Sequence, residues 1–285
     1  MRLPGRALPG ASGKPAVRSG EVTAPRTPVH PTGMHRSRDR RLRLLSLAFA
    51  IGLLASLASA TTVAAAASLP SCKVADTLTA FRGYGDWDRS ILDTRYRLSS
   101  TYKPTDLSST SNAGLSGGGS VRKIIMADLK KMASAARAAG ARFSVESAFR
   151  SYDTQKATFA HWVALHGYAV ALTESARAGH SEHQLGTTLD LKSYGGGAPW
   201  DVNDWATTRA GAWIKTNAWK YGFIISYPKG KQSVTCYIYE PWHVRYVGRD
   251  KAKAVHNSKL TLREYLWREQ HPDPKGFEDG GSSRP

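Results

Sequence analysis

The sequence predicts an α+β domain with a small, mostly antiparallel sheet and flanking helices. Residues 121–140 and 204–220 have apolar residues at helical spacing, whereas residues 142–148, 223–227 and 244–247 have the pattern of strands. These helices and strands do not alternate regularly, as they would around a parallel sheet. Apolar residues make up 41% of the 285-residue chain, enough to bury a core in its middle part.

The first half of this domain predicts two amphipathic helices. Side chains spaced by three or four residues define the first helix, which Gly140 ends: Val121, Ile125, Leu129, Met132 and Ala136. Ser151 or Asp153 caps the second helix, whose expected apolar face is Phe159, Trp162, Val163 and His166. The alanine-rich run from 168 to 178 predicts a short helix or an ordered loop.

The second half predicts one long helix and two short terminal ones. The long helix spans residues 204–220, ends at Gly222, and directs four side chains inward: Trp205, Ala212, Trp213 and Trp219. Residues 249–256 and 260–269 predict the two terminal helices.

Both ends of the chain are expected to lie outside the domain, which we place at residues 68–269. Residues 1–67 form a basic leader, expected to be disordered at its start, and an apolar segment from Leu44 to Leu57 that is typical of an export signal. Met34 is a second candidate start. We expect cleavage at the small residues that follow, with an uncleaved membrane anchor as the alternative. Residues 270–285 are expected to be a disordered tail.

The formal net charge of +18 favours an anionic partner. Charge alone does not separate an anionic cell wall from nucleic acid, a membrane surface or simple solubility.

Two cysteines, Cys72 and Cys236, are too few for a fold built on disulfides. Both follow the export segment, and a bridge between them would persist outside the cytoplasm. We therefore expect a Cys72–Cys236 disulfide, with two free thiols as the alternative.

Two short stretches hold metal-type ligands. His183 and Asp190 lie on either side of Gly186, and His243 follows some fifty residues later. Two imidazoles and one carboxylate leave a fourth position open on Zn²⁺, which is the arrangement of a catalytic site. In a straight strand, side chains seven residues apart face opposite ways. We therefore expect a bend at Gly186, with His183 on a loop and Asp190 on a strand.

Glu240 and Arg150 complete the candidate catalytic set. Pro241 favours a turn, so we expect Glu240 at the mouth of a loop and His243 at the start of the strand that follows. Glu240 would accept a proton from the metal's water, and Arg150 would stabilise the oxyanion of a peptide carbonyl. A surface ion pair for Arg150 or a solvated carboxylate for Glu240 is the structural alternative. Together the two stretches predict a zinc peptidase.

The stretches Ser181–Asp190 and Glu240–Gly248 resemble the VanY-type D-alanyl-D-alanine carboxypeptidases. D-Ala-D-Ala dipeptidases, phage L-Ala-D-Glu endopeptidases and the hedgehog signalling domain share that zinc site and fold. The resemblance runs from about Tyr96 to Gly248. Thr188 departs from the pattern, which usually has Ala there.

The resemblance implies a role for each matching residue. Zn²⁺ would be held by His183, Asp190 and His243, with Glu240 as the general base and Arg150 on the scissile carbonyl. Ser181 and Gln155 would help to hold the peptide.

We therefore expect a secreted, wall-associated zinc D,D-carboxypeptidase that removes the terminal D-Ala of peptidoglycan stem peptides. Its expected surroundings are the anionic cell wall, without a nucleic-acid partner. A lytic endopeptidase on the same fold is the first alternative, because loops such as 194–202 set the substrate length. A non-catalytic zinc-containing wall-binding module is the second, and Glu240 argues against it because a binding site needs no proton acceptor.

Overall fold

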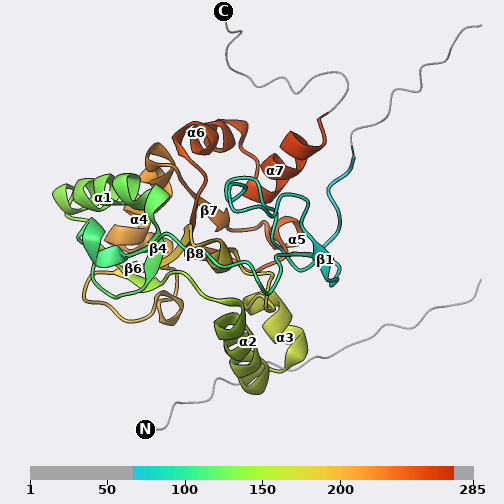
Figure 1. The fold of residues 1–285 in the computed structure, drawn as a ribbon. Helices are drawn as coiled ribbons and strands as arrows, with labels where there is room; N and C mark the ends of the chain where they lie inside the picture. Colours follow the sequence, from blue (N-terminus) through green and yellow to red (C-terminus); the bar gives the residue numbers. More distant parts are fainter. Residues whose placement is uncertain (1–66, 273–285) are drawn as a thin grey trace, which may run out of the picture. The chain divides into compact units, whose positions relative to one another are not determined.

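A four-stranded sheet lies at the centre of the computed structural model, which describes residues 67–272 (Figure 1). Every neighbouring pair in this sheet is antiparallel. In spatial order the strands are β5 (Phe143–Ser147), β6 (Thr188–Ser193), β8 (Glu240–Tyr246) and β7 (Phe223–Tyr227). The predicted α+β class with a mostly antiparallel sheet is therefore confirmed.

Two smaller sheets lie outside the central one. The short strands β1 (Thr77–Leu78) and β2 (Tyr96–Arg97) pair in parallel. The strands β3 (Leu107–Ser109) and β4 (Ser120–Arg122) pair antiparallel, with a 3₁₀ turn, η1 (Thr110–Ala113), between them.

One face of the central sheet packs on α1 (Lys123–Ala138) and α4 (Arg209–Asn217). Leu189, Leu191 and Val244 point into this core and are fully buried. Because side chains alternate along a strand, their neighbours Asp190 and His243 face the opposite side. The main core therefore supports the sheet and leaves its other face free for polar side chains.

The helices α6 (Arg249–Ser258) and α7 (Leu262–Gln270) pack on β7 and form a second apolar cluster with it. Thr261 and Glu264 cap α7 reciprocally. The predicted tail begins one residue inside α7, because Gln270 still belongs to that helix and its Nε2 donates to the carbonyl of Arg89.

The long helix predicted over 204–220 is divided into three pieces. These are the 3₁₀ turn η4 (Trp205–Thr207), the helix α4 and the 3₁₀ turn η5 (Ala218–Tyr221). Thr208 starts α4 afresh, since its hydroxyl accepts from the Gly211 N–H. The break shifts the helical phase, so Ala212 is exposed instead of inward, and Ile214 is buried in its place.

The structure confirms two predicted helix ends and moves the start of one predicted helix. Gly140 and Gly222 have the positive φ of helix-ending residues, 67° and 89°. Val121 belongs to β4, so the first helix starts two residues later than predicted.

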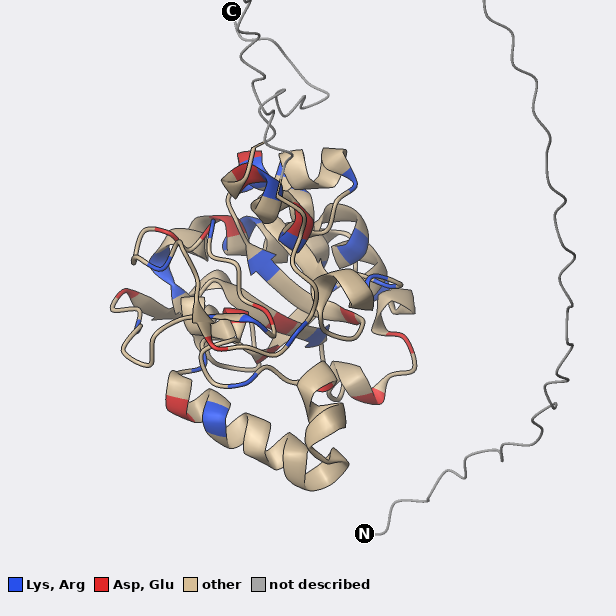
Figure 2. Cartoon of the chain, turned by 90° about the vertical axis from the view of Figure 1, so that its right-hand side faces the viewer, with Lys and Arg blue, Asp and Glu red and all other residues tan. Residues whose placement is uncertain are grey.

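The helices α2 (Tyr152–His166) and α3 (Tyr168–Glu174) form a hairpin at the edge of the structure (Figure 1). Ser151 caps α2, as predicted. The expected apolar face of α2 is only partly covered, because the helix packs mainly on α3 and adds no residue to the apolar clusters. Figure 2 shows that charged residues are sparse on this hairpin.

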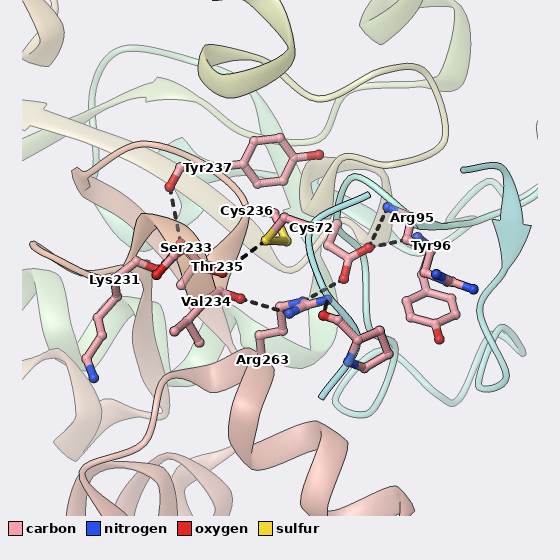
Figure 3. Close-up of a disulfide and its surroundings, with 12 residues drawn as sticks. Cys72, Arg95, Tyr96, Lys231, Ser233, Val234, Thr235, Cys236, Tyr237 and Arg263 are labelled. Carbon is pink, nitrogen blue, oxygen red and sulfur yellow. Dashed lines mark hydrogen bonds and ion pairs between the residues drawn. A yellow bond between two sulfur atoms is a disulfide. The ribbon is translucent and has the colours of Figure 1, made fainter. Parts of the chain in front are cut away.

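A disulfide joins Cys72 to Cys236 (Figure 3). Arg263 on α7 braces the same region: its Nη2 donates to the Pro70 carbonyl at 2.9 Å and its Nη1 to the Val234 carbonyl at 2.8 Å. Its Nε also pairs with the buried carboxylate of Asp93 at 2.6 Å. The N-terminal segment is thereby held against the short helix α5 (Gln232–Thr235) that precedes β8.

The predicted leader, with Met34 and the cleavage sites, lies outside the described residues, as does the tail beyond residue 272. Within residues 67–272, the helices are all too short or too polar to cross a bilayer.

Candidate active site

His183 and Asp190 meet through a bend at Gly186. His183 lies on a single 3₁₀ turn, η2 (Glu182–Leu185), which Ser181 caps by accepting from the His183 N–H. Gly186 ends this turn with a φ of +73°. A Cβ on Gly186 would lie 2.9 Å from the Arg122 side chain, so both the conformation and the space require glycine. The predicted bend is confirmed.

The strand β8 begins at Glu240, directly after a loop, and not at His243, so the predicted start of this strand is wrong by three residues. Opposite β8, Ile225 pairs with Val244 and Tyr227 with Glu240, so β8 holds two more residues than β7 between these pairs. In a regular strand, residues three apart face opposite sides of the sheet. The bulge adds residues to β8 and so turns Glu240 and His243 to the same face. Glu240 Oε2 lies 3.5 Å from His243 Nδ1.

Three buried side chains, His183, Asp190 and His243, each present one ligand atom within 4.8 Å of the others. The Nδ1 of His183 is 2.6 Å from the Ala148 carbonyl, which can only accept, so Nδ1 carries the proton. Nε2 then points its lone pair at Asp190 Oδ2, 3.1 Å away, and lacks a hydrogen-bond donor among the described residues. A lone pair facing a carboxylate in a buried site fits a bound cation.

His243 presents its Nδ1 to the other two ligands, whereas His183 presents its Nε2. Its Nε2 lies 2.9 Å from Glu182 Oε2, and its Nδ1 lies 3.1 Å from Asp190 Oδ1. The Glu182 carboxylate therefore accepts from Nε2–H and leaves Nδ1 to face the ligand cluster. A carboxylate behind a ligating imidazole is a recurrent feature of zinc sites.

Glu182 is itself held by two buried partners. Arg245 Nη1 donates to Oε1 at 2.8 Å, and Ser226 Oγ donates to Oε2 at 2.6 Å. The sequence-based prediction assigned no role to Glu182, Arg245 or Ser226. A signal existed for Arg245, which lies two positions after His243 and so shares its face of the strand.

Burial and pairing shift several pKa values in this cluster. Burial lowers the pKa of His183 to about 4, so its imidazole is neutral and able to ligate. Burial also raises the pKa of Glu240 to about 8, partly offset by His243. Burial also opposes the charged form of His243, but the Asp190 and Glu182 carboxylates outweigh it and raise the pKa of His243 to about 10. Burial likewise opposes the charged form of Glu182, but Arg245 and His243 outweigh it and lower the pKa of Glu182 to about 2. Glu240 is thus a base whose pKa lies near neutral pH.

Arg150 reaches the ligands from the end of β5. Its Nη1 lies 3.4 Å from Asp190 Oδ2, and its side chain is 22% exposed. The Nε donates to Gln155 Oε1 at 2.8 Å, and Nη1 donates to Ser147 Oγ at 2.5 Å. Gln155 is fully buried and its Nε2 donates to the Ala176 carbonyl, so both ends of its amide contact the protein.

The remaining predicted residues lie behind the ligands. Ser181 is 3% exposed, and its hydroxyl caps η2. Thr188 is fully buried on β6, and its hydroxyl has no hydrogen-bond partner among the described residues. The structure therefore gathers His183, Asp190, His243, Glu240 and Arg150 at one place, while Ser181 and Gln155 contact protein groups.

Known proteins match this part of the chain. The family model VanY, D-alanyl-D-alanine carboxypeptidase, matches residues 118–249. The protein YodJ of Bacillus subtilis is 44% identical over 147 residues, which is 51% of this chain and 53% of YodJ. The structure of the LdcB LD-carboxypeptidase is 34% identical, with a TM-score of 0.58, over 66% of this chain and 94% of that one.

A VanY D,D-pentapeptidase mutant in complex with Zn(II) is 29% identical, with a TM-score of 0.54, over 63% of this chain and 99% of that one. The chain spans between 36% and 62% of the length of four curated relatives that it matches. The family match contains the three ligand positions, Glu240 and Arg150. By its fold, its matched segment and these relatives, the chain belongs to the VanY family of D-alanyl-D-alanine carboxypeptidases.

Proposed function

We propose that the protein is a zinc carboxypeptidase that removes the terminal D-alanine from peptidoglycan stem peptides. The convergence of one atom each from His183, Asp190 and His243, with Glu240 beside them, is the observation that carries this proposal. The match to VanY-type enzymes supports the substrate class.

The donor set fits zinc. Two imidazoles and one carboxylate are the protein ligands of many catalytic zinc sites, and the unpartnered Nε2 of His183 is available to ligate. A Zn²⁺ ion bound there would lower the pKa of a coordinated water to about 7 and polarise a carbonyl group.

The chain's own residues supply the proton transfers and the charge stabilisation. Glu240 accepts a proton from the attacking water and returns it to the leaving amine of D-alanine, for which its raised pKa is suited. Arg150 stabilises the negative charge that develops on the carbonyl oxygen. Gln155 and Ser147 hold the guanidinium in the orientation that this role requires.

A second candidate substrate arises from the comparisons. The LdcB LD-carboxypeptidase is more similar to this chain than the VanY D,D-pentapeptidase is, at 34% against 29% identity. The D,D activity would act on a pentapeptide stem that ends in D-Ala-D-Ala. The L,D activity would act on a tetrapeptide stem, in which D-Ala follows an L-residue.

Digestion of both synthetic stems, followed by mass analysis, tests these proposals. We expect free D-alanine from at least one stem and no release after chelation of the metal. Cleavage of the pentapeptide alone identifies a D,D-carboxypeptidase, and cleavage of the tetrapeptide alone an L,D-carboxypeptidase. Internal fragments would refute the carboxypeptidase proposal in favour of the endopeptidase. No product from either stem would refute both.

We also propose that the protein works outside the cytoplasm, in the anionic cell wall. Residues 67–272 contain twenty-eight Lys and Arg against seventeen Asp and Glu, a charge balance that suits such surroundings. Fractionation of cells that produce the full chain tests the location, and recovery in the cytosol would contradict it.

A further inference from the structure

A groove of about 310 Å³ lies beside β7, between the α4–η5 segment and the junction of α6 with α7. Partly exposed apolar side chains line its floor, including Trp219, Ile225 and Leu260. At one end the Trp219 ring stacks on His256, with ring centres 4.2 Å apart. The groove contributes nothing to the metal ligands or to their supporting contacts.

Four lysines line the groove, and no acidic residue does. They are Lys215, Lys229, Lys231 and Lys259. All four are exposed, and Lys231 extends away from the neighbouring disulfide in Figure 3. Only Lys229 has an acidic partner among the described residues, Asp204 at 3.3 Å. The groove is therefore a concave cationic surface whose charge the protein itself leaves mostly uncompensated.

The lowered pKa of His256, at one end of the groove, is consistent with a cationic surface. The pKa of His256 is lowered by burial and, in addition, by the positive charges of Lys259 and Lys220. A positive charge on the imidazole is disfavoured where further cations already stand. The positive charge of Lys259 therefore extends to the end of the groove where Trp219 stacks on His256.

We propose that this groove binds a linear phosphodiester polymer of the wall-polymer type, with sugar or polyol units between the phosphates. Lysine ammonium groups bind phosphate as point charges, and the groove presents four of them without an acidic residue. The apolar floor and Trp219 would contact the carbon atoms between successive phosphates. A recess of this volume suits a narrow chain better than the flat surface of a lipid bilayer.

The strand β7 connects the groove to the active site. Pro228 and Lys229 directly follow Tyr227, whose ring centre is 4.6 Å from that of His243. A polymer held in the groove would therefore keep the metal site next to the material that the proposed enzyme digests. The binding itself does not depend on the proposed function, so it is measured without turnover.

The test titrates the full protein with a fluorescent poly(glycerol phosphate) chain and follows anisotropy at several salt concentrations. Each neutralised phosphate contributes about −0.7 to the slope of log K against log salt on a flexible strand. Three or four contacts therefore predict a slope of about −2 to −3. Lys231→Glu with Lys259→Glu should weaken binding at least about tenfold at low salt and reduce the slope by about 1.4.

Lys130→Glu with Lys131→Glu is the matched control, because it makes the same charge change on exposed residues of α1. This control should retain most of the affinity and the slope. If both double variants lose the same affinity, the loss reflects the net charge of the protein and the proposal is overturned. The absence of binding by the unmodified protein would also overturn it.

Two further probes decide the class of ligand. A thymidine oligonucleotide that binds more tightly than poly(glycerol phosphate) would overturn the proposal in favour of nucleic acid. Phosphatidylglycerol vesicles that bind as tightly, and that lose binding in the groove variant, would overturn it in favour of a membrane surface. Weaker binding of both probes supports the wall-type polymer.

Discussion

Glu182 supports His243 from the side opposite the ligand cluster: its Oε2 lies 2.9 Å from the imidazole Nε2, while Nδ1 faces Asp190. Arg245 and Ser226 fix the carboxylate in turn. This chain of buried contacts determines which nitrogen of His243 is free to ligate.

We predict that Glu182→Gln weakens zinc binding by about 10–100-fold, the usual effect of losing such a supporting carboxylate. An amide is a weaker acceptor for Nε2–H, and it leaves Arg245 without its buried counter-charge. Competition with a chromophoric chelator measures the affinity. Glu146→Gln, which removes a pair with Lys192 that includes none of the three ligands, is the control and should bind zinc normally. Equal zinc affinity in the two variants would show that Glu182 has no such role.

Glu240→Gln should keep the metal and lose hydrolysis, because the amide cannot accept the proton of the attacking water. Metal analysis and D-alanine release on the same sample separate the two effects. Turnover that survives the substitution would remove Glu240 from the mechanism.

Arg150→Ala should lower kcat by about 10²–10³, the usual cost of removing one donor to an oxyanion. Gln155→Leu should produce a smaller loss in the same direction, because the guanidinium remains but loses a hydrogen bond that orients it. Steady-state kinetics with the cleaved stem peptide give both values. A larger loss from Gln155→Leu than from Arg150→Ala would contradict this order.

Zinc binding should release about one proton from His243 at pH 7. The pKa of His243 is raised to about 10, so Nδ1 is protonated and must lose its proton before it ligates, whereas His183, with a pKa of about 4, is already neutral. The apparent affinity should therefore increase as the pH rises toward 10. Calorimetry in buffers of different ionisation enthalpy counts the protons. Glu240→Gln removes any contribution of Glu240, and a count near zero in that variant would contradict the prediction.

Loss of the disulfide should destabilise the domain by about 3–5 kcal/mol, because the bridge closes a long loop between residues 164 apart in sequence. Denaturant unfolding of the Cys72→Ser, Cys236→Ser variant, compared with the unmodified protein, measures the difference. Reductant should destabilise only the unmodified protein. Two alkylatable thiols in the unreduced protein would contradict the bridge itself.

The sequence alone predicted the parts of the structure that depend on one residue type or on a local pattern of apolar residues. Gly186 between two ligands required a bend, and the strand patterns of residues 142–148 and 223–227 predicted β5 and β7 correctly. It was insufficient where pairing decided the geometry. The bulge in β8 depends on the register against β7, and Pro241 gave the misleading signal of a turn.

The buried polar residues behind the ligands were the least predictable part of the site. Glu182 lies in a polar stretch and has the appearance of a surface residue, yet it is 5% exposed. Its role depends on Arg245, which is 63 residues away in the sequence. Such contacts are set by tertiary packing, which local patterns do not encode.

The Cys72–Cys236 bond has a practical consequence for the integrity of the molecule. It joins the start of the described residues to a point four residues before Glu240, so it encloses the α2–α3 hairpin and the turn that carries His183 in one covalent ring. A single proteolytic nick in the hairpin would leave two fragments that migrate as one species until thiols are added. Damage of this kind would pass unnoticed on a non-reducing gel.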